Sequence, residues 1–197
     1  MLDILRDFPD QFETKRLTIR SPRPGDGPAL NAAVAASWER LQPWMAWAQS
    51  PQPPPVAESE AWIRQAHAAF LQRIDLPLLC FLKGTETQVV GSGLHRIDWT
   101  IPRFEIGYWV RTGYEGQGYV TEAVLGISHF AFLTLGARRV EIHCDARNAR
   151  SAAVARRAGY ELEAILRCHR RNPHTGALSD TLIFARVLSE EDVPGDS

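Results

Sequence analysis

Hydrophobic and polar positions along the chain repeat with two periods, and these periods separate strands from helices. Alternation at every second residue predicts a strand over 16–20, whereas apolar residues three and four apart predict helices over 58–74 and 119–135. Shorter runs between turn residues complete the set, with strands at 78–83, 89–97, 104–110, 140–144, 160–167 and 181–188 and helices beginning near Asp26 or Gly27 and over 149–158. Hairpins come early and strands alternate with helices late, which predicts a mixed α/β fold.

One compositional break interrupts this pattern, the proline-rich segment 50–55. It predicts a loop, because successive prolines exclude both a helix and a strand ladder. The segment is too short to be an interdomain linker. We therefore expect a single domain over residues 1–197, with a core over about 12–188 and a flexible tail at 189–197.

Composition and charge restrict the class of protein. The 197 residues are 45% hydrophobic and carry 22 basic and 23 acidic side chains, which is typical of a globular protein and lacks the basic excess of a nucleic-acid binder. Three widely spaced cysteines indicate reduced thiols. The longest apolar stretch, 123–137, is too short to cross a bilayer, and the amino terminus has no signal-peptide core. We expect a cytoplasmic protein without membrane or nucleic-acid partners.

A glycine-rich turn at 113–118 lies between a predicted strand and a predicted helix. Clustered glycines allow positive φ angles, so that backbone N–H groups converge on an anion, and the helix dipole adds about 0.3–1 kcal/mol. The turn is neither a Walker loop nor the dinucleotide fingerprint, since it lacks Gly-Lys-Ser/Thr and has Thr121 where the fingerprint needs glycine or alanine. A phosphate cradle and a plain tight turn both fit these residues.

Two motifs resemble the Gcn5-related N-acetyltransferase (GNAT) superfamily. Gly116 and Gly118 match the Gln/Arg-x-x-Gly-x-Gly/Ala loop for coenzyme A, although Gly113 stands at its first position. The segment 148–160 resembles the later Asn-x-x-Ser … Gly-Phe/Tyr block, and together with 13–20 and 105–109 it is similar to the RimJ/RimL-like branch. The resemblance implies a mostly antiparallel central sheet, splayed in its middle and flanked by about four helices. Founding members of this branch acetylate the amino termini of ribosomal proteins.

The resemblance also implies acetyl-CoA as the co-substrate and a set of residues that bind it. The pyrophosphate would rest on backbone N–H groups from Tyr114 to Thr121, and the pantetheine arm would pair with the strand at 109–111. A backbone N–H near Val110 would stabilise the oxyanion. The expected cofactor-binding residues are Trp109, Val110, Arg111, Tyr114, Glu115, Gly116, Gln117, Gly118, Tyr119, Val120, Thr121, Asn148 and Ser151. Asn148 is also a good helix cap.

Acetyl transfer from a thioester to an amine needs a base and a proton donor for the leaving thiolate. By the resemblance, Glu105 is the expected base, and Ser151 or Tyr160 the expected acid. Glu141, His143, Asp145 and His169 are further candidates for the base, and Cys144 for a nucleophile. A weak base suffices for an α-amine of pKa about 8, whose neutralisation at pH 7 costs about 1.4 kcal/mol, against about 4.6 for lysine. We expect no metal, because Cys168, His169 and His174 lie on a single loop without the paired spacing of a zinc site.

The remaining question is which amine accepts the acetyl group. Trp38, Trp44 and Trp47 lie in the region that borders the acceptor channel in this family, and with Glu105 they are the expected substrate-binding residues. These aromatics could equally cover the core or form a homodimer contact. We expect an N-acetyltransferase that acts on a protein amino terminus by direct attack. The alternatives are an enzyme for a small amine, such as an antibiotic, polyamine or amino acid, and a non-catalytic acyl-CoA binding module.

Overall fold

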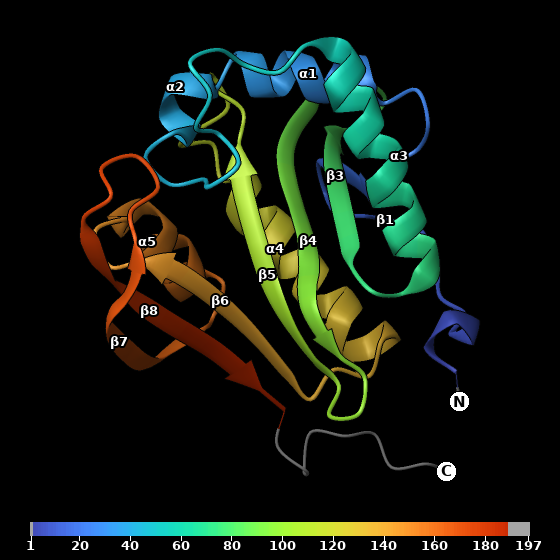
Figure 1. Cartoon of the computed structure of the whole chain (residues 1–197). Coiled ribbons are helices and arrows are strands. Elements are labelled where there is room, and N and C mark those ends of the chain that lie inside the picture. The colour runs from blue at the N-terminus through green and yellow to red at the C-terminus, as the bar shows by residue number, and fades with distance from the viewer. Residues whose placement is uncertain (1, 189–197) are drawn as a thin grey trace.

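A computed structural model describes residues 2–188 of the chain, and one eight-stranded sheet runs through them in the order β1-β2-β3-β4-β5-β6-β8-β7 (Figure 1). Neighbouring strands are antiparallel except β5 and β6, which are parallel. The strands are β1 (Gln11–Glu13), β2 (Leu17–Arg20), β3 (Leu76–Leu82), β4 (Gln88–Asp98), β5 (Arg103–Val110), β6 (Arg139–Asp145), β7 (Glu161–Arg171) and β8 (Leu178–Val187).

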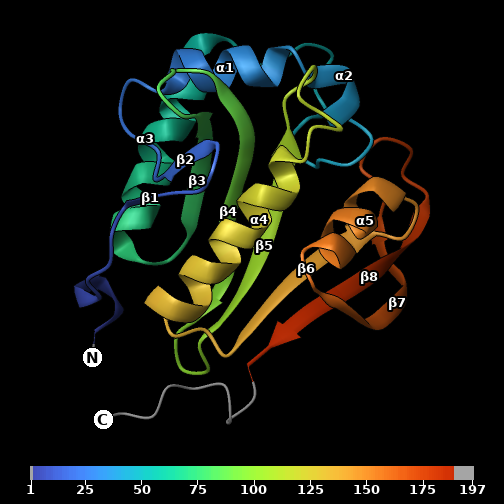
Figure 2. The same cartoon turned by 180° about the vertical axis from the view of Figure 1, so that it is seen from behind.

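Helices cover both faces of this sheet. They are α1 (Gly27–Ala35), α2 (Trp38–Leu41), α3 (Val56–Gln72), α4 (Tyr119–His129) and α5 (Ala149–Arg157), with a 3-10 turn at Asp3–Leu5 and a π turn at Phe130–Thr134. The first three lie over one face, and α4 and α5 cover the other (Figures 1 and 2). A large core forms under α4 and α5, and a smaller one, which includes Leu30, Ile63 and Phe81, forms under α1 and α3.

The two parallel strands pair over only part of their length. Residues 103–105 of β5 pair with residues 139–141 of β6, and no pairing follows along the rest of these strands. In Figure 1 the two strands start side by side and separate toward their arrowheads. The sheet is therefore splayed in its middle, and the facing edges of β5 and β6 are left open beyond Glu105 and Glu141.

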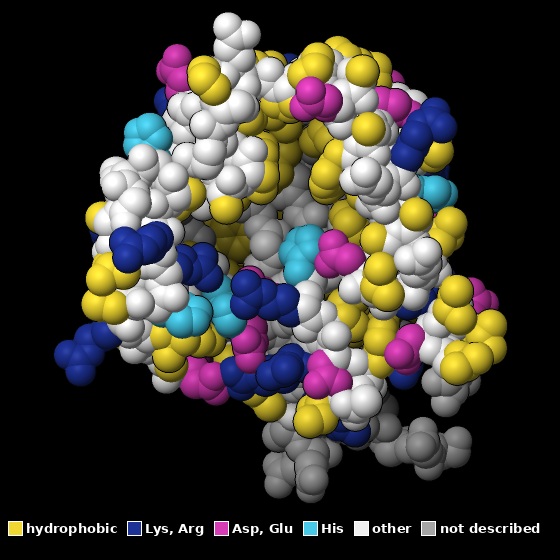
Figure 3. All heavy atoms as spheres, in the orientation of Figure 1, with side chains coloured by type: hydrophobic (Ala, Val, Ile, Leu, Met, Phe, Trp, Pro, Cys, Tyr) yellow, Lys and Arg dark blue, Asp and Glu magenta, His cyan; other side chains and the backbone are white. Residues whose placement is uncertain are grey.

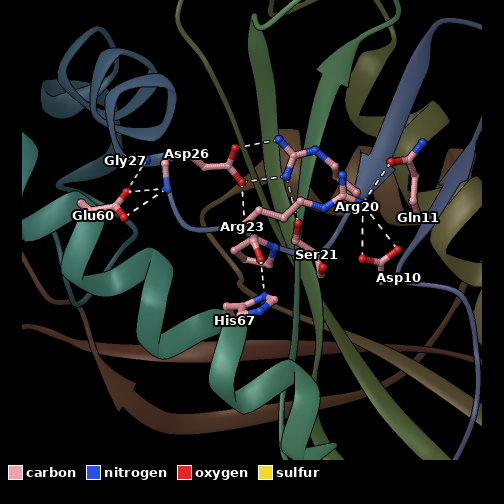
Figure 4. Close-up of polar contacts among 11 residues, drawn as sticks. Asp10, Gln11, Arg20, Ser21, Arg23, Asp26, Gly27, Glu60 and His67 are labelled. Atoms are coloured by element: carbon pink, nitrogen blue, oxygen red, sulfur yellow. Dashed lines mark hydrogen bonds and ion pairs between the residues drawn. The ribbon is translucent and has the colours of Figure 1, made fainter.

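A buried ion pair fixes the beginning of α1 (Figure 4). Arg20 on β2 donates two hydrogen bonds of 2.7 Å to Asp26. Asp26 occupies the N-cap position expected from the sequence, but its carboxylate is engaged by Arg20 and makes no side-chain cap bond. Glu60 of α3 instead accepts the N–H of Gly27 at 3.0 Å. The first N–H group of α1 is thus satisfied from a neighbouring helix.

The structure confirms the mixed α/β class and the splayed, mostly antiparallel sheet. All the predicted strands and helices are present, with ends shifted by up to a few residues. The helix expected over 119–135 changes to the π turn after His129, and β1, α2 and the 3-10 turn were not predicted. The expected tail at 189–197 lies outside the described residues. Within residues 2–188, no helix combines the length and apolar character that crossing a membrane requires.

Candidate active site

The glycine turn presents a row of backbone donors at the beginning of α4. Gly113, Gly116 and Gly118 have φ angles of 94°, 72° and 82°, in the left-handed region that favours glycine. The N–H groups of residues 115–121 form no hydrogen bond with any described residue. The N–H of Tyr114 belongs to a different set, because it bonds to the carbonyl of Arg111 at 3.1 Å. Seven consecutive positions of the expected phosphate cradle are therefore able to bind an anion.

The β1–β2 hairpin holds this turn in place. Arg16 donates to Glu122 in the first turn of α4, from its backbone N–H at 2.7 Å and from Nε at 2.6 Å, and Thr14 donates to the same carboxylate at 2.6 Å. Arg16 also reaches the carbonyl of Gln117 at 3.0 Å and lies over the ring of Tyr119. Burial raises the pKa of Glu122, but the bonds from Thr14 and Arg16 outweigh it and hold the pKa below its ordinary value.

A cavity of about 640 Å³ occupies the gap between β5 and β6. Its walls include Tyr108, Val110, Cys144 and Ser151. The N–H of Arg111 bonds to Val89 on β4 at 2.8 Å, and backbone groups alternate in direction along a strand. The backbone groups of Val110 and Tyr108 therefore point into the gap, whereas those of Arg111 are already used.

Helix α5 brings the hydroxyl group of Ser151 to the opposite wall. Asn148 caps the helix by accepting the N–H of Ser151 at 3.0 Å, which confirms the capping role expected from the sequence. The Ser151 hydroxyl donates to the Tyr108 hydroxyl at 3.0 Å, and Tyr108 donates to the carbonyl of Ser151 at 2.9 Å. Burial raises the pKa of Tyr108, so that this phenol keeps its proton at neutral pH. Burial likewise raises the pKa of Cys144, which keeps it a thiol and disfavours it as a nucleophile.

Tyr160, the other expected acid, lies elsewhere. It is only 3% exposed, and its hydroxyl forms a 2.7 Å hydrogen bond with Ser128 of α4. Burial raises the pKa of Tyr160 to about 12. It does not line the cavity, whereas Ser151 and Tyr108 do. Tyr108 was not singled out from the sequence, because only the packing of β5 against α5 shows that its hydroxyl meets Ser151.

Glu105 lies at the closed end of the gap, where the strands separate. It does not line the cavity itself, but Oε2 is 3.2 Å from Nδ1 of His143 and 3.3 Å from Arg96, and both of these residues line it. Arg96 reaches this position from an irregularity in β4, where its φ is 49°. His143 was one of several candidates in the sequence, and Arg96 was not among them.

Aromatic side chains form the wall nearest α2. Trp44 lines the cavity and is 38% exposed. Trp47 is 52% exposed and packs against Trp109, which also lines the cavity, with ring centroids 6.3 Å apart. Trp38 is buried in the smaller core and bonds to the carbonyl of Ser50. Of the three expected substrate-binding tryptophans, two therefore reach the cavity or its wall and one supports them from behind.

Positive charge gathers at the cavity mouth. Figure 3 shows basic and histidine side chains along one rim of the hollow on this face. The lining includes Arg40, which pairs with Glu115 at 3.2 Å, and also Arg150, Arg170 and Arg171. Within residues 2–188 none of the last three forms an ion pair. The mouth therefore carries more positive than negative charge.

A second, more open hollow of about 550 Å³ lies on the outer side of the glycine turn. Gly118 and Thr121 line it together with Lys15 and Arg157. The expected cofactor-binding residues thus divide into three sets: Trp109, Val110, Glu115, Val120, Asn148 and Ser151 line the central cavity, Gly118 and Thr121 line the outer hollow, and Arg111, Tyr114, Gly116, Gln117 and Tyr119 line neither.

Known proteins that resemble this chain in sequence and in fold include acetyltransferases. The acetyltransferase (GNAT) domain family matches residues 16–161. YdaF of Bacillus subtilis (strain 168), whose name provisionally describes it as a ribosomal N-acetyltransferase, is 30% identical over 180 residues, which are 90% of this chain and 93% of that protein. The solved structure of the microcin C7 self-immunity acetyltransferase MccE with acetyl-CoA and AMP has a TM-score of 0.81 at 22% identity and covers 93% of this chain and 99% of its own.

A further solved structure, that of RimL, the ribosomal L7/L12 α-N-protein acetyltransferase, in complex with coenzyme A, has a TM-score of 0.80 at 22% identity and covers 89% of this chain and 96% of its own. Fold, site and relatives together define an N-acetyltransferase. The chain belongs to the GNAT acetyltransferase family, and within it to the RimJ/RimL-like branch.

Proposed function

We propose that this acetyltransferase uses acetyl-CoA and transfers the acetyl group to the α-amine of a protein amino terminus, with a ribosomal protein as the substrate. The choice of acetyl-CoA as the acetyl donor is supported by the row of unbonded N–H groups at residues 115–121, which lies next to the open edge of β5. The acceptor rests on the names of YdaF and RimL and on the chemistry of the cavity mouth.

The residues fit the donor. The N–H groups of the glycine turn bind the pyrophosphate, and the open backbone groups of Val110 and Tyr108 bind the extended pantetheine arm as a neighbouring strand would. An arm in this position directs the thioester toward the closed end of the gap, where Glu105 lies. Lys15 and Arg157, beside the outer hollow, supply positive charge for the remaining phosphate of the coenzyme.

The chain's own groups supply each proton and each hydrogen bond that the reaction needs. Glu105 accepts a proton from the acceptor ammonium, and the neutral amine attacks the thioester carbonyl to form the C–N bond. The N–H of Val110 donates to the developing oxyanion. As the C–S bond breaks, the thiolate takes a proton from the hydroxyl pair of Ser151 and Tyr108, which are 3.0 Å apart. The nitrogen, which became cationic when it attacked, loses its second proton through solvent to the deprotonated hydroxyl pair, so that the amide forms and the pair is restored.

The charge at the mouth favours one class of acceptor over another. Arg150, Arg170 and Arg171 repel polycations such as polyamines and aminoglycosides, since like charges at an interface are unfavourable. A peptide with a single α-ammonium and acidic residues after it is attracted by the same groups. Trp44 and Trp47 provide apolar area for its first side chains.

The test is release of free thiol from acetyl-CoA in the presence of peptides with varied first residues, polyamines, aminoglycosides and free amino acids. We expect release that depends on the peptide, with the acetyl group located on the α-nitrogen by mass spectrometry. Release with small amines alone would overturn the proposal that the acceptor is a protein amino terminus. Stoichiometric binding of coenzyme A without turnover of any amine would identify a binding module instead of an enzyme.

A further inference from the structure

Two buried polar atoms face each other at the closed end of the gap without a hydrogen bond between them. They are Oε2 of Glu105 on β5 and Nδ1 of His143 on β6, 3.2 Å apart and both shielded from solvent. Buried polar groups are almost always hydrogen-bonded, and one that is not destabilises the fold. Since both atoms are acceptors unless one carries a proton, the contact is favourable only with a proton between them.

The other side of the His143 ring decides which nitrogen is protonated. Nε2 lies 2.6 Å from Oε2 of Glu141. Burial raises the pKa of Glu141, but hydrogen bonds from Arg139 and His143 outweigh it and leave the pKa below its ordinary value, so this carboxylate is ionised and accepts. Nε2 therefore carries a hydrogen, and a neutral His143 presents the lone pair of Nδ1 to Glu105.

We infer that Glu105 and His143 act as one proton-holding pair, in which His143 receives the proton that Glu105 removes from the acceptor amine. The inference rests on the proposed function. Before the acceptor binds, the Glu105 carboxylate faces the lone pair of Nδ1, an unfavourable contact that the arrival of one proton relieves. The acceptor ammonium loses one proton to Glu105, the proton settles on Nδ1, and the resulting imidazolium lies between the carboxylates of Glu105 and Glu141 until solvent removes the proton.

The surroundings favour storage of this charge on His143. The charged and titratable groups near the pair are Arg96 on β4, Arg139, Glu141 and Asp145 on β6, and Glu163 and His169 on β7, and β8 contributes the apolar Ile183 opposite His143. Arg139 is occupied by Glu141 and Glu163. Arg96 is largely exposed, so solvent screens its charge. His143 is thus a positioning residue that acts through Glu105.

The test is an NMR titration of the histidine ring nitrogens in the full chain without coenzyme, which does not depend on activity. The signal of His143 is assigned by its loss in His143→Gln. In Glu105→Gln the side-chain amide donates to Nδ1 and favours the neutral ring, so we expect the midpoint of protonation of His143 to fall by about one pH unit, a tenfold loss of proton affinity. Glu163→Gln is the matched control, because it removes a carboxylate of the same network that does not contact His143, and it should shift the midpoint much less.

An unchanged midpoint of His143 protonation in Glu105→Gln would overturn the inference that the two residues share a proton. If that variant does not fold, Glu105→Asp withdraws the carboxylate by one methylene group and should give a smaller shift in the same direction. The kinetic readout is the pH profile of kcat/KM in His143→Gln, in which we expect the plateau to fall at least about tenfold and the acid limb to move to lower pH. A lower plateau with an unmoved limb would indicate a purely structural role. Absence of turnover in the wild type would count against the proposed function, whereas the titration would still test the pair.

Discussion

Arg16 binds Glu122 through both its backbone and its side chain, at 2.7 and 2.6 Å, and this joins the β1–β2 hairpin to the first turn of α4. The same guanidinium reaches the carbonyl of Gln117 inside the glycine turn. A residue that touches both the turn and the helix fixes the direction in which the free N–H groups point. The shape of the glycine turn therefore depends on the turn of a hairpin that lies about a hundred positions earlier in the sequence.

Arg16→Ala should weaken coenzyme binding without abolishing it. The variant loses the side-chain hydrogen bonds to Glu122 and to the carbonyl of Gln117, and a hydrogen bond that involves a charged group contributes about 1.5–3 kcal/mol. The glycine turn is then held less firmly, so we expect the Kd for coenzyme A to rise about tenfold. Isothermal titration calorimetry measures it. Arg23→Ala is the control, because Arg23 pairs with Asp10 on the surface away from the turn. Equal affinity in both variants would show that the turn holds its shape alone.

Acid should destabilise the protein partly through Glu122. Its pKa is below the ordinary value of about 4.3 in the folded chain, so the unfolded chain binds a proton first and the contribution to stability is complete above that value. The contribution is lost as the pH falls through the folded pKa. Urea unfolding at pH 6, 4.5 and 3.5 should therefore show a smaller difference between the wild type and Glu122→Gln at the lowest pH. A difference that is independent of pH would contradict this account.

Gly118→Val should abolish coenzyme binding. The residue has a φ of 82° at the N-cap of α4, where a β-branched side chain is strained and would cover the N–H groups of the turn. Gly84→Val is the matched control, since Gly84 has a φ of 72° in the distant β3–β4 turn and nothing lies within 4 Å of an added Cβ. Both variants should lose stability on heating, but only Gly118→Val should lose the ligand. Normal affinity for coenzyme A in a folded Gly118→Val protein would show that the glycine turn is not part of the donor site.

Glu105→Gln should lower turnover by about 10²–10⁴ while leaving the Kd for coenzyme A unchanged, since the substitution removes the proton acceptor and keeps the shape. Thiol release at saturating peptide measures this loss. Glu141→Gln, one strand away, should have a smaller effect because Glu141 contacts His143 and Arg139 and does not itself accept the proton of the amine. A normal rate for Glu105→Gln would assign the base to another group.

Arg170→Glu should change the preference among acceptors. We expect kcat/KM to fall for peptides with acidic second and third residues and to rise for basic ones, with a combined change in preference of about tenfold or more, because like charges are unfavourable at the mouth. Arg167→Glu makes the same change in net charge on β7 without lining the cavity. If both variants change the preference equally, the effect comes from overall charge and not from contact at the mouth.

Much of the fold and of the donor site could be predicted from the sequence, because the signals are local. Periodicity places the helix after Gly118, and the spacing of the glycines marks the turn itself. Strand β1 and helix α2 escaped prediction because they have 3 and 4 residues, too few for a period, and they form through contacts with distant elements. Asp26 stands at the N-cap of α1, where the sequence predicts the helix to begin, but its carboxylate binds Arg20, and the sequence does not show that Arg20 lies beside it.

The acceptor side could be predicted only in part. Glu105 and His143 are 38 positions apart, and their contact depends on the parallel register of β5 with β6, which pairs Glu105 with Glu141. Arg96 enters through a local irregularity in β4, and Tyr108 meets Ser151 only after α5 packs on the sheet. Alternation along each strand gives the face of a residue but not its neighbour on the next strand.

Under the proposed function, the open edge of β5 links the stability of the protein to the binding of its donor. A sheet with an unpaired internal edge is incomplete, and under the proposed function the extended arm of the coenzyme completes it by occupying the place of a missing strand. A ligand that binds only the folded chain stabilises it by about 2.7 kcal/mol at a hundred times its Kd. A cell rich in acetyl-CoA would therefore keep more of this protein folded and protected from proteases than a starved cell, so that the amount of enzyme follows the supply of its own substrate.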